Sequence, residues 1–168
     1  MEDAAGGLMM QKEVPSIRIW PMSSQIPGFR GREIADVQQN CFLRDLPRQG
    51  GRFRYRSAGL NAPSGTLVLF QFQAHIIASA LFIRDEKFTQ PRSGYAGELH
   101  FETSSIRTFK PLDLDAMRAV WPRFRAFGHV KQYLNPEGYP ALLEHLKSVK
   151  RPRRITKEGG RPDNKVKV

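Results

Sequence analysis

The sequence has a single cysteine, no long hydrophobic run and comparatively few acidic residues. Because Cys41 is the only cysteine, an intramolecular disulfide bond and any zinc site built from several cysteines are excluded. No apolar stretch approaches the roughly 20 residues that cross a bilayer, and the N-terminus carries acidic residues where a signal peptide is basic. We therefore expect a soluble intracellular protein that does not contact membranes.

Positive charge is what the chain has in excess. Its 168 residues include 27 Lys plus Arg against 16 Asp plus Glu, a formal net charge of +11. An excess of this size favours anionic partners such as phosphate backbones. The hydrophobic content of 40% is sufficient for one folded domain. We expect a flexible leader over 1–15, the domain over 16–150, and a basic tail or linker over 151–168.

The order of apolar patterns predicts an α+β fold. Two central runs of β-branched and aromatic residues, joined at Ala74-His75, are apolar on both faces and therefore read as paired strands buried inside a small mixed β-barrel. About three helices are expected to flank it. The expected strands are 16–20, 66–73, 76–83, 94–102, 105–109 and 128–134, and the expected helices are 32–43, 112–118 and 138–149. The expected core includes Ile17, Ile34, Val37, Leu67, Leu69, Ile77, Leu81, Ile106 and Leu143.

The sequence offers no convincing catalytic set. The four histidines stand singly, no glycine-rich phosphate loop occurs, and no nucleophile elbow is present. The nearest approach to a metal-nuclease triad is Asp85-Glu86-Lys87, which lacks a preceding Pro-Asp pair and reads as a solvated turn. We expect no catalytic residue, no bound metal and no cofactor in this chain.

The basic-aromatic segment 52–56 carries the functional hypothesis. If its tyrosine converges with Trp20 and Tyr95 at one mouth of the barrel, the three rings form a cage for a planar base, with stacking worth roughly 1–3 kcal/mol per base. Trp121, inside an apolar helix, is assigned to packing. The predicted base-pocket residues are Trp20, Tyr55, Ser57, Phe72 and Tyr95, and the predicted phosphate-binding residues are Arg52, Arg54, Arg56, Lys150, Arg151, Arg153 and Arg154.

From Ser16 to Lys150 the chain resembles the EVE branch of the PUA-like superfamily, whose relatives include the YTH readers of methylated adenine. The family's basic-aromatic segment, similar to Arg-Asn-Tyr-Gln-Ala-Arg-Asn, corresponds here to Arg54–Asn61. Its next strand corresponds to Gly65–Phe72, with Thr66 where the family usually has Asp. The family's late Ser-Val-Gln-Pro-like signature corresponds to Val130–Pro136. A Trp often found before the third strand is absent, and Tyr95 is its nearest substitute.

The resemblance implies a module that reads a modified nucleobase, namely 5-methylcytosine, 5-hydroxymethylcytosine or N6-methyladenine. Base flipping from double-stranded DNA into an aromatic pocket would bring the base to the site. Similar domains target modification-dependent restriction endonucleases in the bacterial cytoplasm, joined to an HNH nuclease or an AAA+ motor. Two alternatives remain open, a PUA-like RNA-binding module and a small nuclease. The nuclease would take its metal ligands from Asp85, Glu86, Glu98 and Glu102.

Overall fold

A computed structural model describes residues 13–23 and 28–147. Most of the expected leader and all of the expected tail therefore lie outside the described residues. The same holds for four of the predicted phosphate-binding residues, Lys150, Arg151, Arg153 and Arg154. No helix in the described part of the chain is long and apolar enough to cross a membrane.

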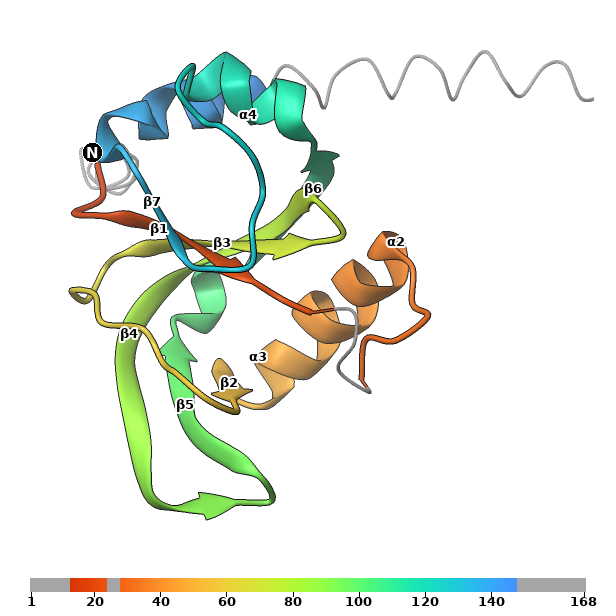
Figure 1. Ribbon diagram of the computed structural model, residues 1–168, viewed down its shortest axis with the longest axis vertical. Coiled ribbons are helices and arrows are strands. Elements are labelled where there is room, and N and C mark those ends of the chain that lie inside the picture. Colours follow the sequence, from red (N-terminus) through yellow and green to blue (C-terminus); the bar gives the residue numbers. More distant parts are fainter. Residues whose placement is uncertain (1–12, 24–27, 148–168) are drawn as a thin grey trace, which may run out of the picture.

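The chain folds as a mixed α+β structure in which each predicted strand and helix has a counterpart (Figure 1). The strands are β1 (Ile17–Pro21), β2 (Arg52–Tyr55), β3 (Leu67–Phe72), β4 (His75–Arg92), β5 (Tyr95–Phe101), β6 (Arg107–Leu112) and β7 (Gln132–Leu134). The helical segments are α2 (Ile34–Val37), η1 (Gln38–Asp45), α3 (Leu46–Arg48), η2 (Thr103–Ser105), α4 (Leu114–Val120), η3 (Pro136–Gly138) and a last helix over 139–147. Asp113 caps α4, since its Oδ1 accepts a hydrogen bond from the Ala116 N–H at 2.9 Å.

Several boundaries differ from the prediction for local reasons. The turn between β3 and β4 is Gln73–Ala74, whose φ angles of 53° and 59° give the positive values that two-residue hairpin turns require. Pro111 does not end β6, because an edge strand tolerates a residue without an N–H group. The helix that follows β1 runs on to Arg48, since Pro47 occupies the first turn of α3.

The sheet is open. Its seven strands follow the order β2-β5-β4-β3-β1-β7, with β6 paired to β4 beside this path. β1 and β3 are parallel, and β7 joins β1 in the antiparallel sense. Among the described residues the end strands β2 and β7 are not paired with each other. The closed barrel predicted from the sequence is therefore not observed.

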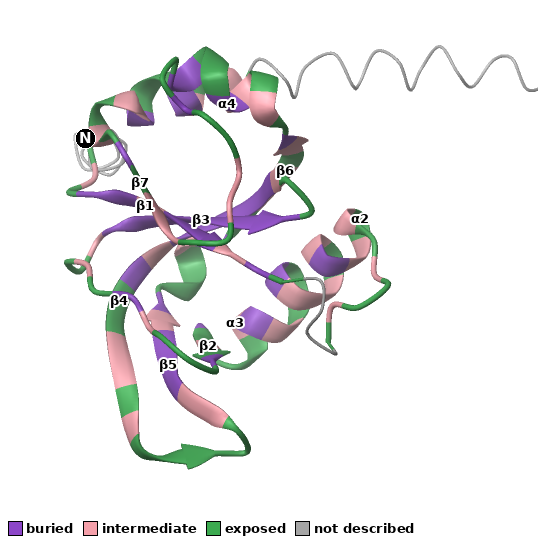
Figure 2. Ribbon diagram, in the orientation of Figure 1, coloured by how far each residue is buried: buried purple, intermediate pink, exposed green. Residues whose placement is uncertain are grey.

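β1 and β3 send alternate side chains into two separate hydrophobic cores. One, the α4 core, lies against α4 and the helix 139–147 and contains Ile17, Ile19, Leu67, Leu69, Trp121 and Leu142. The other, the α2–α3 core, contains Trp20, Val37, Phe42, Tyr55, Val68, Phe70 and Phe72. Both faces of β3 are thus covered, which explains why every residue of this strand, Gln71 included, is buried (Figure 2). Of the predicted core residues, Ile17, Val37, Leu67, Leu69, Ile77 and Ile106 are buried, while Ile34, Leu81 and Leu143 are partly buried against these cores.

The open sheet curls so that the end strand β2 approaches β1, which lies next to the other end, through side chains. The Trp20 ring of β1 lies with its centroid 6.0 Å from that of Phe53 and 6.3 Å from that of Tyr55, both in β2. Phe53 also packs against Phe70 of β3, with a centroid distance of 5.4 Å. Aromatic contacts, rather than strand hydrogen bonds, therefore bring β1 and β2 together.

Candidate functional site

A hollow of about 970 Å³ opens beside the contact between β1 and β2. Its walls come from the end of β1, the helical segment η1–α3, β2 and the loop after it, the start of β5, and the loop before β7. These segments are far apart in the sequence and meet because the sheet curls. Seven of the predicted site residues line this hollow together: Trp20, Arg52, Arg54, Tyr55, Arg56, Ser57 and Tyr95.

Phe72 is the predicted pocket residue that does not line the hollow. Its side chain is fully buried in the α2–α3 core, where its ring packs against Phe29 at a centroid distance of 5.8 Å. The alternation of β3 turns Phe72 inward with Phe70, so its assignment to the base pocket is corrected to a packing role. Phe29, which it supports, does line the hollow.

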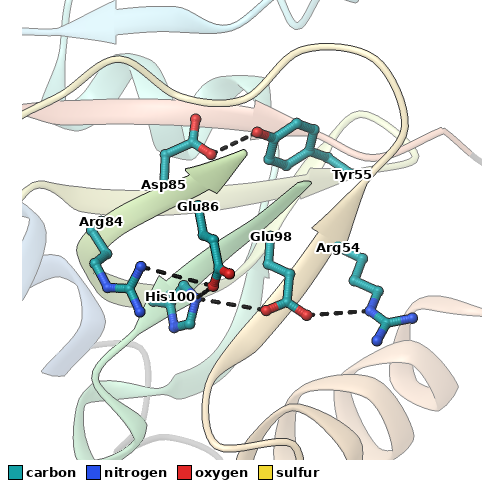
Figure 3. Close-up of polar contacts among 7 residues, drawn as sticks. All are labelled: Arg54, Tyr55, Arg84, Asp85, Glu86, Glu98 and His100. Carbon is teal, nitrogen blue, oxygen red and sulfur yellow. Dashed lines mark hydrogen bonds and ion pairs between the residues drawn. The ribbon is translucent and has the colours of Figure 1, made fainter. Parts of the chain in front are cut away.

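Tyr55 is held firmly in the wall of the hollow. Its hydroxyl donates to Asp85 Oδ1 at 2.6 Å (Figure 3), and Asp85 Oδ2 in turn accepts from the Leu60 N–H at 3.1 Å. Burial, followed by the hydrogen bond to Asp85, raises the pKa of the Tyr55 hydroxyl, which therefore stays protonated. A Cβ at Gly97 would lie 2.6 Å from Tyr55 Cζ, so the tyrosine ring needs glycine beneath it. Tyr55 thus supplies a fixed ring rather than a mobile one.

Cationic groups lie over the other two rings. Lys131 Nζ lies 4.9 Å from the centre of the Trp20 ring, and the Arg56 guanidinium carbon lies 4.5 Å from the centre of the Tyr95 ring. Arg54 approaches the same tyrosine at 5.7 Å. These are cation–π distances. A planar ligand that stacks on Trp20 or Tyr95 would take the place of a cation, which could then turn toward the ligand's phosphate.

Lys131 was not among the predicted site residues. Its ammonium group donates to the Ala58 carbonyl at 3.3 Å and so connects the loop before β7 to the loop after β2. Burial, followed by the charge of Arg18, lowers the pKa of Lys131. Its sequence context, GHVKQYL, reads only as a short strand with a polar position. Only the curl of the sheet places this lysine over Trp20.

The hollow carries more positive than negative charge. Arg32 and Arg54 each have a carboxylate partner, Asp36 at 2.7 Å and Glu98 at 3.3 Å respectively. Because its cationic side chains outnumber its acidic ones and aromatic rings lie beside them, the hollow is suited to an anionic ligand with a flat ring. Its lining contains five cationic side chains, Arg32, Arg52, Arg54, Arg56 and Lys131, and two acidic ones, Asp45 and Glu98.

Behind this wall, charged side chains form a network across β2, β5 and β4 (Figure 3). His100 Nε2 lies 2.9 Å from Glu86 Oε1 and 3.6 Å from Glu98 Oε1. The hydrogen bond from His100 lowers the pKa of Glu86. Arg84 approaches Glu86 at 3.8 Å, and Arg54 approaches Glu98 at 3.3 Å. The network ties three strands together by their side chains.

Three of these residues could share a metal ion. The ligand atoms of Glu86, Glu98 and His100 lie within 4.8 Å of one another. The carboxylates, however, face Arg84 and Arg54, which would compete with a cation. Asp85 instead binds Tyr55, Leu60 and Lys87, and Glu102 is exposed. The structure therefore brings together two of the four carboxylates that the nuclease alternative requires.

No protein family and no curated protein matches this chain. Two crystal structures of ASCH from Zymomonas mobilis are similar to this chain. The structure of a point mutant shares 10% identity over 76% of this chain and 96% of that chain, with a TM-score of 0.48. The second structure shares 11% identity over 79% of this chain and 94% of that chain, with a TM-score of 0.44.

Proposed function

We propose that this chain is a nucleic-acid-binding module that receives one extruded nucleobase in the hollow. The observation that supports this proposal most strongly is the gathering of three rings, Trp20, Tyr55 and Tyr95, with five cationic side chains around one opening. Neither feature alone would be specific, since rings often pack in cores and cations often face solvent. Their convergence in a single hollow supplies a stacking surface and phosphate contacts together.

The size of the hollow is consistent with this role. At about 970 Å³ it lies near the upper end of ordinary small-molecule sites, which are about 300–1,000 Å³. A nucleotide with part of its backbone can enter, whereas a duplex cannot. The base must therefore leave the helix, at a cost of a few kcal/mol that stacking and hydrogen bonding inside the hollow offset.

The ligand we propose is a modified base in double-stranded DNA, namely 5-methylcytosine, 5-hydroxymethylcytosine or N6-methyladenine. This part of the proposal rests on the resemblance of Arg54–Asn61 to the EVE segment, because the first five residues of that segment, 54–58, line the hollow. In that role the chain would bind without catalysis and would direct a nuclease partner to modified DNA in a bacterial cytoplasm. PUA-like RNA binding is the alternative function that the experiment must distinguish from this one.

A binding panel with matched tyrosine variants tests the proposal. Tyr95 and Tyr133 each carry an arginine over the ring, at 4.5 Å and 4.4 Å, but Tyr133 is 67% exposed and does not line the hollow. Fluorescence anisotropy should show tighter binding of duplexes with a modified base than of unmodified duplexes. Tyr95→Ala should weaken modified-duplex binding by about 5- to 150-fold, the range of one stacking contact. Tyr133→Ala should leave it unchanged.

Three results would count against the proposal. Equal affinity of the wild-type protein for modified and unmodified duplexes would remove base reading. Tighter binding of RNA than of DNA with the same sequence would instead favour the RNA-binding alternative, because only RNA offers the 2′-hydroxyl. Parallel weakening by Tyr95→Ala and Tyr133→Ala would show that neither ring reads the base.

A further inference from the structure

The tip of the β4–β5 hairpin, residues 87–96, extends away from the two hydrophobic cores, apart from Ala96, which packs against the α2–α3 core; we call this tip the finger. β4 runs on to Arg92 and turns at Ser93–Gly94, whose φ angles are 53° and 84°. Figure 1 shows the finger projecting beyond the rest of the sheet, and no side chain within it is buried (Figure 2). A projecting, exposed hairpin contributes little to the folded core, so its shape needs another explanation.

The finger has irregular pairing and a uniform charge sign. Lys87 pairs with Gly97 and Arg92 with Tyr95, so four residues of β4 lie opposite the single residue Ala96 of β5. Such a bulge bends the strand and re-aims its side chains. The finger sequence KFTQPRSGYA contains no acidic residue. Its cations and its polar Thr and Gln side chains face solvent.

Both strands of the finger contribute side chains to the walls of two openings. Tyr95 lines the hollow described above, while Lys87, Phe88 and Ala96 line a second one of about 410 Å³. The two openings share Tyr55, Ser57 and Ala58 as a common wall. A nucleic acid whose base occupies the first opening would therefore lie against the finger.

We propose that the finger enters the major groove of a B-form DNA duplex beside the extruded base. This inference deepens the proposed function and rests on it. The major groove of B-form DNA, about 12 Å wide, admits a two-stranded ribbon, whereas the major groove of A-form RNA is too deep and narrow for side chains to read. The occupant of the finger surface is thus duplex DNA, attracted by a surface free of acidic groups. The guanidinium of Arg92 lies 3.9 Å from the centre of the Phe88 ring. In this proposal Arg92 makes the principal contact with the phosphate backbone of the DNA.

Charge reversal at Arg92 with a matched control tests the finger. Arg123 is also exposed, and the α4 region to which it belongs lies at the opposite end of the molecule from the finger (Figure 1). Arg92→Glu and Arg123→Glu change the net charge equally. A difference between their dissociation constants therefore reflects where the charge lies on the molecule. Dissociation constants would be measured by anisotropy for a DNA duplex, the same strand alone, and an RNA duplex of the same sequence, across a salt series.

Arg92→Glu should weaken DNA-duplex binding at least about tenfold more than Arg123→Glu and lower the salt slope by about one per lost phosphate contact. Single-strand and RNA-duplex binding should change equally in the two variants. The finger proposal would be overturned if Arg92→Glu weakened binding of the single strand or of the RNA duplex as much as binding of the DNA duplex. It would also be overturned if Arg92→Glu weakened DNA-duplex binding no more than Arg123→Glu does. If the wild type shows no modified-base preference but the Arg92 effect is selective for duplex DNA, base reading fails and the finger stands. Failure of the wild type to bind any of the probes would overturn both.

Discussion

The two tryptophans of this chain are almost equally buried and yet have different neighbours. Trp121 is 6% exposed, its indole N–H donates to the Asn135 carbonyl at 2.9 Å, and a Cβ at Gly138 would lie 2.8 Å from its Cε2. Trp20 is 7% exposed, but it lines a hollow and has the Lys131 ammonium 4.9 Å from its ring centre. One ring is sealed by backbone and the other is covered by a cation that can move.

The difference shows that burial alone does not separate a packing ring from a binding ring. Both tryptophans sit at the ends of regular elements, and each contributes to one of the two cores. What distinguishes them is whether the atoms against the ring are fixed backbone or a flexible side chain beside an opening. The assignment of Trp121 to packing is confirmed by its hydrogen bond and its contact with Gly138, whereas a binding role for Trp20 remains a prediction.

The largest expected effect is the loss of stability when the buried ring of Trp121 is removed. Trp121→Ala is expected to lower the free energy of unfolding by about 3–5 kcal/mol, because it removes a large ring from the α4 core and leaves a cavity. The affinity of the folded protein for nucleic acid should not change. Urea unfolding measures the first quantity, and anisotropy at a temperature where the variant is folded measures the second.

Trp20→Phe supplies the contrast. It keeps an aromatic ring in the α2–α3 core and should cost less stability than Trp121→Ala, yet it should weaken nucleic-acid binding because the stacking surface is smaller. If the folded Trp121→Ala protein lost as much affinity as Trp20→Phe, the distinction between the two rings would be wrong.

The sequence predicted the individual strands and helices better than the pairings and contacts between them. Alternation in β1 and the apolar runs of β3 and β4 are local patterns, and all three strands were predicted. The strand β2 was noticed for its charges and rings rather than as a strand, although its arginines and aromatic residues alternate as strand residues do. Its pairing with β5, and hence the pairing of Arg54 with Glu98, depends on contacts 44 residues apart. No local pattern contains such information.

The candidate site was predicted in part for the same reason. Trp20, Tyr55 and Tyr95 were singled out by residue type beside arginines, and the curl of the open sheet brings them to one hollow. Phe72 was misplaced because the direction of a β3 side chain depends on register, which a one-residue slip reverses. Lys131 was missed because a single lysine in the predicted strand 128–134 carries no signal until the fold places it, in the loop before β7, over the Trp20 ring.

An intermediate effect should follow from pushing Tyr55 out of its place in the wall. A Cβ at Gly97 would overlap the Tyr55 hydroxyl and lie 2.7 Å from the Glu86 carbonyl, so Gly97→Ala is expected to cost about 1–3 kcal/mol of stability. The same shift should weaken nucleic-acid binding, because the Tyr55 ring moves. Denaturant midpoints and anisotropy measure the two effects.

Gly128→Ala is the matched control for that substitution. The nearest atom to a Cβ there is Gln132 Nε2 at 3.9 Å, an ordinary contact distance, so neither stability nor binding should change. Were Gly97→Ala as harmless as Gly128→Ala, Tyr55 would have room to move and would not be the fixed ring described above.

The smallest expected effect is a pH dependence of binding that comes from Lys131. Burial and the neighbouring Arg18 lower its pKa from the ordinary 10.5, while the charge of Asp85 acts in the opposite direction. Deprotonation removes a positive charge from the hollow, so affinity for nucleic acid should fall as the pH rises through this lowered pKa, before an ordinary lysine loses its charge. Lys131→Arg keeps the charge at every pH in this range and should flatten the decline. Anisotropy titrations of both proteins at successive pH values between neutral and alkaline would measure it, and parallel curves would mean that the cation over Trp20 takes no part in binding.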